Sequence, residues 1–150
     1  MKLASVDEIL DFAIEREEEA VQFYEDLAGR VNAPSMQQVF RDFAREERGH
    51  KAKLRAIKQG KLLLPAAEKT MDLKIADYAV DVSPDSDLDY QEALILAMKR
   101  EKASFRLYTD LAARTDDENV RTSLLALAQE EAKHKLRFEI EYDDKILTEN

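Results

Sequence analysis

Apolar residues recur at steps of three and four along four stretches of the chain, the spacing that places them on one face of an α-helix. The predicted core-facing stripes of the first two stretches are Ala13, Glu17, Ala20, Tyr24, Leu27 and Val31, and Met36, Phe40, Phe43, Glu47, His50, Leu54 and Ile57. Those of the last two stretches are Leu94, Ala97, Glu101, Ser104, Tyr108 and Leu111, and Val120, Leu124, Leu127, Glu131, His134 and Phe138. Each stripe is mostly apolar but contains one glutamate, and the second and fourth also contain a histidine.

Start and stop signals set the bounds of these helices. The predicted helices run over about residues 6–30, 36–59, 89–114 and 119 to the mid-140s. Capping-box pairs open the first three: Ser5 with Glu8, Ser35 with Gln38, and Asp89 with Glu92. Asn119 is expected to cap the fourth helix, and Gly60 to end the second in the left-handed conformation.

The connection over residues 61–88 is much longer than the other two. Short connections join antiparallel neighbours, whereas a long one can travel the length of a bundle. Part of it, residues 71–80, is apolar enough for a short helix or a packed strap. The expected fold is therefore all-α, an antiparallel four-helix bundle with one long crossover between the second and third helices.

Composition agrees with a single helical domain spanning residues 1–150. The chain is 45% hydrophobic and 37% charged, with three glycines and three prolines, so few residues interrupt a helix. It contains no cysteine, which excludes disulfides, thiolate zinc sites and cysteine-ligated iron centres within these residues. Any metal must therefore be bound by carboxylates and histidines.

Charge and hydropathy narrow the expected partners and location. A formal net charge of -9 argues against a nucleic-acid partner, which requires a basic face. Residues 1–10 contain two acids and no apolar run, and no stretch approaches the roughly 18 apolar residues of a membrane helix. We expect a soluble, cytoplasmic protein with no membrane partner.

The chain contains an internal repeat with an offset of 84 residues. The offset aligns residues 23–28 with 107–112 and residues 46–51 with 130–135, with no gap between the two blocks. Two copies of one helical hairpin, about residues 5–60 and 89–147, are therefore expected.

Both copies interrupt the apolar stripe with residues that bind metals. The candidate ligands are Glu17, Glu47, His50, Glu101, Glu131 and His134. Four buried carboxylates need positive charge, which two divalent ions would supply, and Glu-x-x-His places both side chains on one helical face. Oxygen and nitrogen donors suit iron, manganese or zinc. The alternative is a buried salt-bridge network or a wet core, although no lysine or arginine shares these stripes.

Acids outside the stripes serve as a comparison for the candidate ligands, and two tyrosines within the stripes have two possible roles. Five acids lie off the stripes and should be solvated: Glu15, Glu18, Glu19, Glu46 and Glu130. Tyr24 and Tyr108 each follow a stripe glutamate by seven residues. They are either core aromatics with hydrogen-bonded hydroxyls or residues that orient a ligand or pass an electron.

The two Glu-x-x-His motifs, with one glutamate from each of the other helices, resemble the rubrerythrin branch of the ferritin-like di-iron superfamily. The resemblance spans about residues 6–142 and implies two iron ions as cofactors, with manganese or zinc as other occupants. It implies that Glu17 and Glu101 are terminal ligands, that Glu47 and Glu131 bridge the ions, and that His50 and His134 each bind one. It also implies a homodimer. The crossover over residues 61–88, with Leu62, Leu63 and Leu64, is the candidate contact surface, and the alternative is that these leucines cover the end of their own bundle.

The resemblance implies an oxidoreductase that reacts with hydrogen peroxide or O2, a peroxidase or a ferroxidase. Two features depart from full-length rubrerythrins: no cysteine can form a rubredoxin centre, and Met98 and Ser104 leave Glu101 without a second glutamate three residues away. Turnover would therefore use an external donor such as a separate rubredoxin or a flavoprotein. A non-catalytic iron-handling protein and a metal-free assembly protein remain the alternatives.

Overall fold

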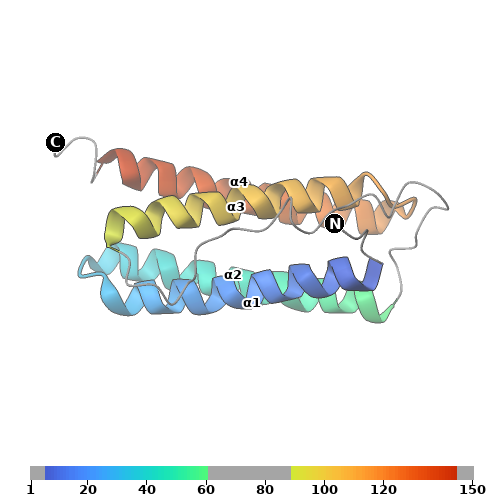
Figure 1. Cartoon of the computed structure of the whole chain (residues 1–150), viewed down its shortest axis with the longest axis horizontal. Helices are drawn as coiled ribbons and strands as arrows, with labels where there is room; N and C mark the ends of the chain where they lie inside the picture. Colours follow the sequence, from blue (N-terminus) through green and yellow to red (C-terminus); the bar gives the residue numbers. More distant parts are fainter. Residues whose placement is uncertain (1–5, 61–88, 145–150) are drawn as a thin grey trace. The chain divides into compact units, whose positions relative to one another are not determined.

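The computed structural model describes residues 6–60 and 89–144. These residues form four α-helices, α1 (Val6–Arg30), α2 (Pro34–Gln59), α3 (Tyr90–Ala112) and α4 (Glu118–Tyr142), as Figure 1 shows. The described residues contain no strand, which confirms the all-α prediction. The expectations for the Ser5 cap and for residues 61–88, with their leucines, lie outside the described residues.

The chain divides into two compact units, one holding α1 and α2 and the other holding α3 and α4. In each unit the two helices lie side by side and run in opposite directions (Figure 1). Residues 31–33 join α1 to α2, and residues 113–117 join α3 to α4. The two hairpins correspond to the two copies of the 84-residue repeat.

The first hairpin differs from the prediction at both ends of α2. The helix begins at Pro34, and its N-cap residue Ala33 makes no side-chain capping hydrogen bond. The predicted Ser35 cap was wrong because proline suits the first turn, where no intrahelical partner for its missing N–H is needed. Gly60 has φ -79° and ψ -6°, a right-handed conformation, so the left-handed cap was also wrong.

The second hairpin confirms one predicted cap and corrects another. Asp89 and Glu92 form the expected capping box, in which Asp89 Oδ1 accepts from the Glu92 N–H at 2.7 Å. Asp117, rather than Asn119, caps α4 by accepting from the Val120 N–H at 3.0 Å. A helix that starts at residue 118 leaves the earlier aspartate in the extended conformation that a cap requires.

The predicted stripes are the buried faces of the helices, with three differences. Phe43, Val31 and Ser104 are half-buried, and Ala44 is buried beside Phe43 on α2. The Tyr24 ring stacks on Phe40 with centroids 6.4 Å apart and meets the edge of Phe43 at 5.9 Å. These packed stripes hold the helices of each hairpin together and fix which residues face inward.

Three ion pairs also join α1 to α2 at the surface. Lys51 Nζ lies 2.5 Å from Glu18, Lys58 Nζ lies 2.5 Å from Asp11, and Arg48 pairs with Glu25. The Lys51 hydrogen bond lowers the pKa of Glu18. The equivalent pairs in the second hairpin are Lys135 with Lys102, Tyr142 with Ile95, and Ala132 with Thr109, none of which can form such a bridge. The two copies therefore share their buried faces but differ outside.

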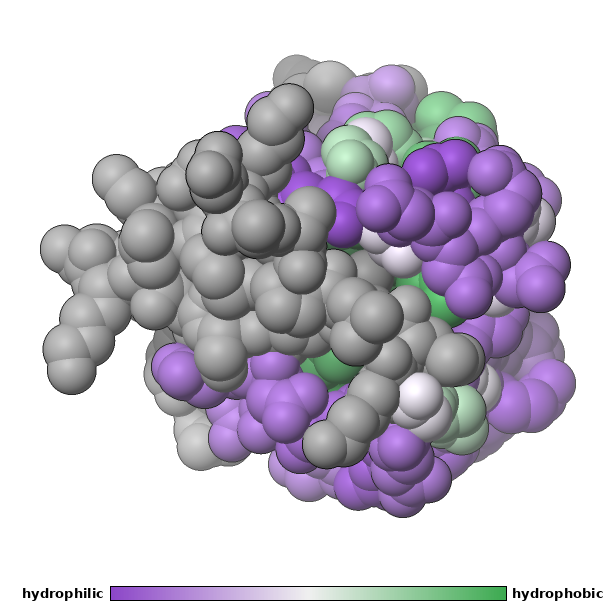
Figure 2. Space-filling model, turned by 90° about the vertical axis from the view of Figure 1, so that its right-hand side faces the viewer, coloured by the Kyte–Doolittle hydropathy of each residue, from purple (hydrophilic) through white to green (hydrophobic). Residues whose placement is uncertain are grey.

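The visible surface agrees with this division between buried and solvated faces. Figure 2 shows mostly hydrophilic side chains among the described residues on the face it presents. No helix in the described part of the chain is long and apolar enough to cross a membrane.

Candidate metal centre

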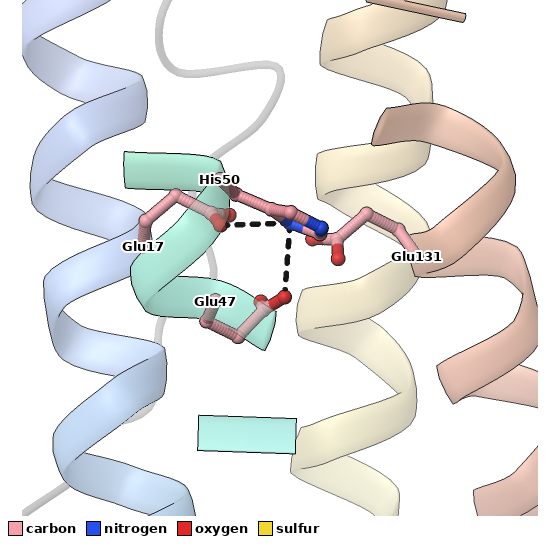
Figure 3. Close-up of side chains that lie close together, drawn as sticks. All are labelled: Glu17, Glu47, His50 and Glu131. Atoms are coloured by element: carbon pink, nitrogen blue, oxygen red, sulfur yellow. Dashed lines mark ion pairs between the residues drawn. The ribbon is translucent and has the colours of Figure 1, made fainter. Parts of the chain in front are cut away.

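The first hairpin brings three of the predicted ligands together, Glu17 from α1 and Glu47 and His50 from α2 (Figure 3). His50 Nδ1 lies 3.1 Å from Glu17 Oε2 and 3.0 Å from Glu47 Oε1. All three residues are buried, with exposed fractions of 1%, 1% and 3%. The spacing of three residues within α2 places Glu47 and His50 one above the other on its inner face. We call these residues the first triad.

The second hairpin repeats this arrangement with Glu101 from α3 and Glu131 and His134 from α4. His134 Nδ1 lies 3.5 Å from Glu101 Oε2 and 3.7 Å from Glu131 Oε1. These residues are also buried, with exposed fractions of 1%, 0% and 3%. We call them the second triad. Each predicted ligand thus meets the other two from its own copy of the repeat.

The donor atoms of each triad are close enough to share one ion. One donor atom from each residue lies within 4.8 Å of those of the other two. Oxygen and nitrogen ligands bind zinc at about 2.0–2.2 Å, so two donors on one ion of this size lie within roughly 4.4 Å. The imidazole–carboxylate distances of 3.0–3.7 Å satisfy that limit. The donor set therefore fits one divalent ion in each hairpin.

Charge favours the same interpretation. Each triad buries two carboxyl groups beside one imidazole, so a protonated histidine could balance only one ionised carboxylate. An uncompensated buried charge costs several kcal/mol even after relaxation. A divalent ion would balance both carboxylates of a triad and use the neutral imidazole as a ligand. The two buried carboxylate–histidine clusters therefore suggest a di-metal protein.

The acids outside the stripes provide an internal comparison. Glu15 and Glu46 are exposed, and Glu18, Glu19 and Glu130 are half-buried. None of these five is buried, as predicted. The burial of the triad glutamates is thus a property of their helical positions and not of glutamates in general.

The structure confirms that Tyr24 and Tyr108 belong to the buried faces. Their exposed fractions are 0% and 1%. The Tyr24 ring also contacts Phe23, with centroids 5.6 Å apart. Their core position is therefore established, while a role in orienting a ligand or passing an electron stays a prediction.

One buried acid was missed by the sequence patterns. Glu141 of α4 is 5% exposed, and its Oε2 accepts a hydrogen bond of 2.7 Å from the Tyr90 hydroxyl. Arg137 Nη1 lies 3.9 Å from Oε1 of the same residue. The signal was present, because Glu141 follows Phe138 by three residues and so continues the α4 stripe, and because it aligns with Ile57 of the first hairpin.

Replacing Tyr90 with phenylalanine should lower the free energy of unfolding by about 1–3 kcal/mol, because buried Glu141 loses a hydrogen-bond donor. Chemical denaturation would measure this. A Tyr90→Phe, Glu141→Ile chain should recover stability, since isoleucine is the residue of the first hairpin. Burial, followed by the hydrogen bond to Glu141, raises the pKa of Tyr90. The protonated Tyr90 hydroxyl therefore stabilises the folded chain fully below the ordinary pKa of about 10, and this stabilisation is lost as the pH rises through the higher pKa of the folded state. An unchanged stability in Tyr90→Phe would contradict this account.

On α3, neither of the residues three positions from Glu101 carries a carboxylate. Met98 and Ser104 are half-buried at the positions three residues before and after it. Neither side chain can supply a carboxylate oxygen. The described acids of the second hairpin thus give its triad two glutamates and one histidine.

Comparisons with known proteins place this geometry in a family. The family model described as rubrerythrin matches residues 8–142. The chain matches none of the curated proteins.

Two solved structures show the fold. A hypothetical protein from Pyrococcus furiosus is 23% identical, with a TM-score of 0.74 over 93% of this chain and 89% of its own. A protein from Thermotoga maritima, described as a "putative ferritin-like diiron-carboxylate protein", is 24% identical, with a TM-score of 0.75 over 97% of this chain and 96% of its own. The fold is therefore ferritin-like, with four helices paired as hairpins and a long linker between the second and third.

The family model covers most of the 150 residues and includes every residue of both triads. The chain contains no cysteine, so these residues include no rubredoxin centre. The chain belongs to the rubrerythrin family.

Proposed function

We propose that the chain is a di-iron oxidoreductase that reduces hydrogen peroxide or O2 at a centre formed by the two triads. The observation that carries the proposal is the duplicated burial of two glutamates and one histidine, with donor atoms within 4.8 Å in each hairpin. A structural polar core would require neither the duplication nor the repeated ligand set.

The proposed assembly uses all six residues. Glu17 and Glu101 would be terminal ligands, Glu47 and Glu131 would bridge two ions, and His50 and His134 would each bind one. Membership of the rubrerythrin family supports these roles. When bound, the two irons supply the electrons that the oxidant takes up.

The residues of this chain would set the conditions for that chemistry. The four carboxylates would balance the charge of the two ions, and the packed stripes would hold the donors in place and limit the access of water. Small Ala20 and half-buried Ser104 lie one turn from Glu17 and Glu101 and would leave room for a small oxidant. These contributions are positioning, charge balance and exclusion of water.

Turnover would also need electrons from outside these residues. They contain no cysteine and so no cysteine-ligated electron carrier. A separate rubredoxin or a flavoprotein is the proposed donor. The same absence favours a second candidate function, iron binding with a single oxidation and no repeated turnover.

Anaerobic loading with Fe(II) followed by limited pulses of peroxide or O2 tests the proposal. An oxidoreductase should consume oxidant repeatedly when a chemical reductant is added after each pulse, with two irons retained per chain. One oxidation that reductant cannot reset would instead support iron handling. A chain that binds no transition metal would contradict both functions and leave an assembly role.

A further inference from the structure

The exposed face of α3 carries a stripe of cations beside the second triad. Lys99, Lys102 and Arg106 are exposed and recur at steps of three and four, so they lie on one face of the helix. Between residues 93 and 109 the only acid of α3 is Glu101, which is buried in the second triad. We call Lys99, Lys102 and Arg106 the α3 cation stripe.

The first hairpin has the opposite charge at the same place. The residues of α1 that align with the stripe are Glu15, Glu18 and Gln22. Residues 9–25, which align with 93–109, contain six acids and one cation, Arg16. The six acids are Asp11, Glu15, Glu17, Glu18, Glu19 and Glu25. Because the two hairpins share their buried faces, this reversal of charge is not needed for helix packing, and it weakens the attraction of the second triad for metal ions.

The seam between α3 and α4 lacks the ion pair that the first hairpin has. There, Glu18 meets Lys51 across the seam, with Nζ 2.5 Å from the carboxylate. Lys102 and Lys135 occupy these two positions in the second hairpin, so the repeat places two like charges across the seam. Lys135 pairs with Glu139 of its own helix, whereas Lys102 forms no ion pair with any described residue. An external carboxylate would supply the missing counter-charge.

A negatively charged protein is the partner that matches this stripe. The chain has a net charge of -9, so an acidic partner is repelled by the molecule as a whole and attracted by a local group of cations, which orients the encounter. Lys99 and Lys102 flank Glu101 in the sequence. A protein docked on the stripe is therefore separated from the second triad by no more than the width of one helix, about 10–12 Å. This short separation suits a partner that passes electrons.

We propose that the α3 cation stripe is the docking surface for an acidic electron-carrier protein. The occupant is a redox protein because the stripe lies on a helix that supplies a ligand, and because the chain has no cysteine-ligated carrier of its own. A docked carrier loses one electron for each Fe(III) that becomes Fe(II). The inference rests on the proposed function and adds the surface at which the external donor binds.

Exchanging Lys99 and Lys102 for the glutamates of the first hairpin tests this surface. The probes are a purified rubredoxin and a purified flavodoxin, each chosen with a net negative charge. In a Lys99→Glu, Lys102→Glu chain loaded with excess Fe(II) and oxidised by one pulse of peroxide, the second-order rate constant for re-reduction by the carrier should fall at least about tenfold at low salt. The difference should shrink as salt rises, and re-reduction by an uncharged chemical reductant should be unchanged.

The matched control is a Lys53→Glu, Arg55→Glu chain. Both residues are exposed on α2, and the two double variants change the net charge by the same four units. The control should be reduced by the carrier nearly as fast as the natural chain. In the α3 variant, the glutamate at position 102 can pair with Lys135 as the equivalent residues do in the first hairpin, so circular dichroism should show an intact fold.

Calorimetry with the metal-free chain separates docking from redox function. The natural chain and the α2 control should bind the carrier at low salt, and the α3 variant should bind at least about tenfold more weakly. A natural chain that binds neither carrier, or two variants that lose binding equally, would overturn the docking surface even if the chemical reductant sustains turnover. An iron centre that no reductant resets would instead reject the oxidoreductase, while the binding measurement would still decide the surface.

Discussion

Replacing Glu47 with glutamine is expected to remove bound iron and, at the same time, to make the metal-free chain more stable. Glu47 Oε1 lies 3.0 Å from His50 Nδ1 in the buried first triad. Losing a direct ligand should weaken metal binding by more than about 100-fold, since even residues that only orient ligands contribute 10–100-fold. Metal analysis after purification with excess Fe(II) would measure the loss.

The higher stability expected for the metal-free Glu47→Gln chain follows from the charges of the first triad. Without metal, two buried carboxyl groups share one imidazole, whereas Glu47→Gln leaves one carboxylate with one imidazole. Relieving this imbalance should raise the free energy of unfolding by about 1–4 kcal/mol. Urea denaturation of the natural chain and of the Glu47→Gln chain, each with a chelator present, would show whether the free energy of unfolding rises.

The neighbouring acid Glu46 supplies the control. It is exposed, so Glu46→Gln should change neither metal content nor metal-free stability appreciably. A Glu47→Gln chain that keeps two ions would contradict the ligand assignment. One that loses both metal and metal-free stability would show that the triad is a structural polar network.

The second large effect expected is unequal metal binding, with the first triad filling before the second. This rests on the proposed metal function. The residues within two positions of the first triad are four acids and four cations: Glu15, Glu18, Glu19, Glu46, Arg16, Arg45, Arg48 and Lys51. Those beside the second triad are one acid and five cations: Glu130, Lys99, Arg100, Lys102, Lys133 and Lys135. The second triad therefore lies in a more positive field, which disfavours a cation.

The size of this effect can be bounded. Four extra positive charges acting on a divalent ion from about 10 Å in screened water correspond to roughly 1 kcal/mol, or about tenfold in affinity. The wider donor spacing of the second triad, 3.5 and 3.7 Å against 3.1 and 3.0 Å, acts in the same direction. The difference should grow at low salt.

Anaerobic calorimetry with Fe(II) should resolve two binding steps. In a His50→Ala chain only the weaker step should remain, and in a His134→Ala chain only the stronger. A Lys99→Glu, Lys102→Glu chain should tighten the weaker step, because both lysines are exposed and flank Glu101. Two equal steps would reject the loading order while leaving the di-metal function intact, whereas no binding would reject both.

The order of the elements and the identity of the buried stripes could be predicted from the sequence because helical periodicity is a local property. The stripes on α2 and α4 were right except at Phe43, where the wider apolar face also buries Ala44. The helix ends were less predictable. At the starts of α2 and α4 the sequence offers more than one residue that can begin the helix, and the structure begins them at Pro34 and after the Asp117 cap.

The sequence by itself determined the two hairpins, the inward position of the two triads and the absence of thiolate chemistry, because each follows from spacing or composition. Only the tertiary structure decided that donors from α1 and α2, and from α3 and α4, meet within 3.7 Å. It also revealed the Tyr90–Glu141 hydrogen bond and the exposure of Leu125, Leu136 and Ile140 on α4. These features join residues distant in sequence or depend on which faces remain uncovered, and only the packing of whole helices fixes either.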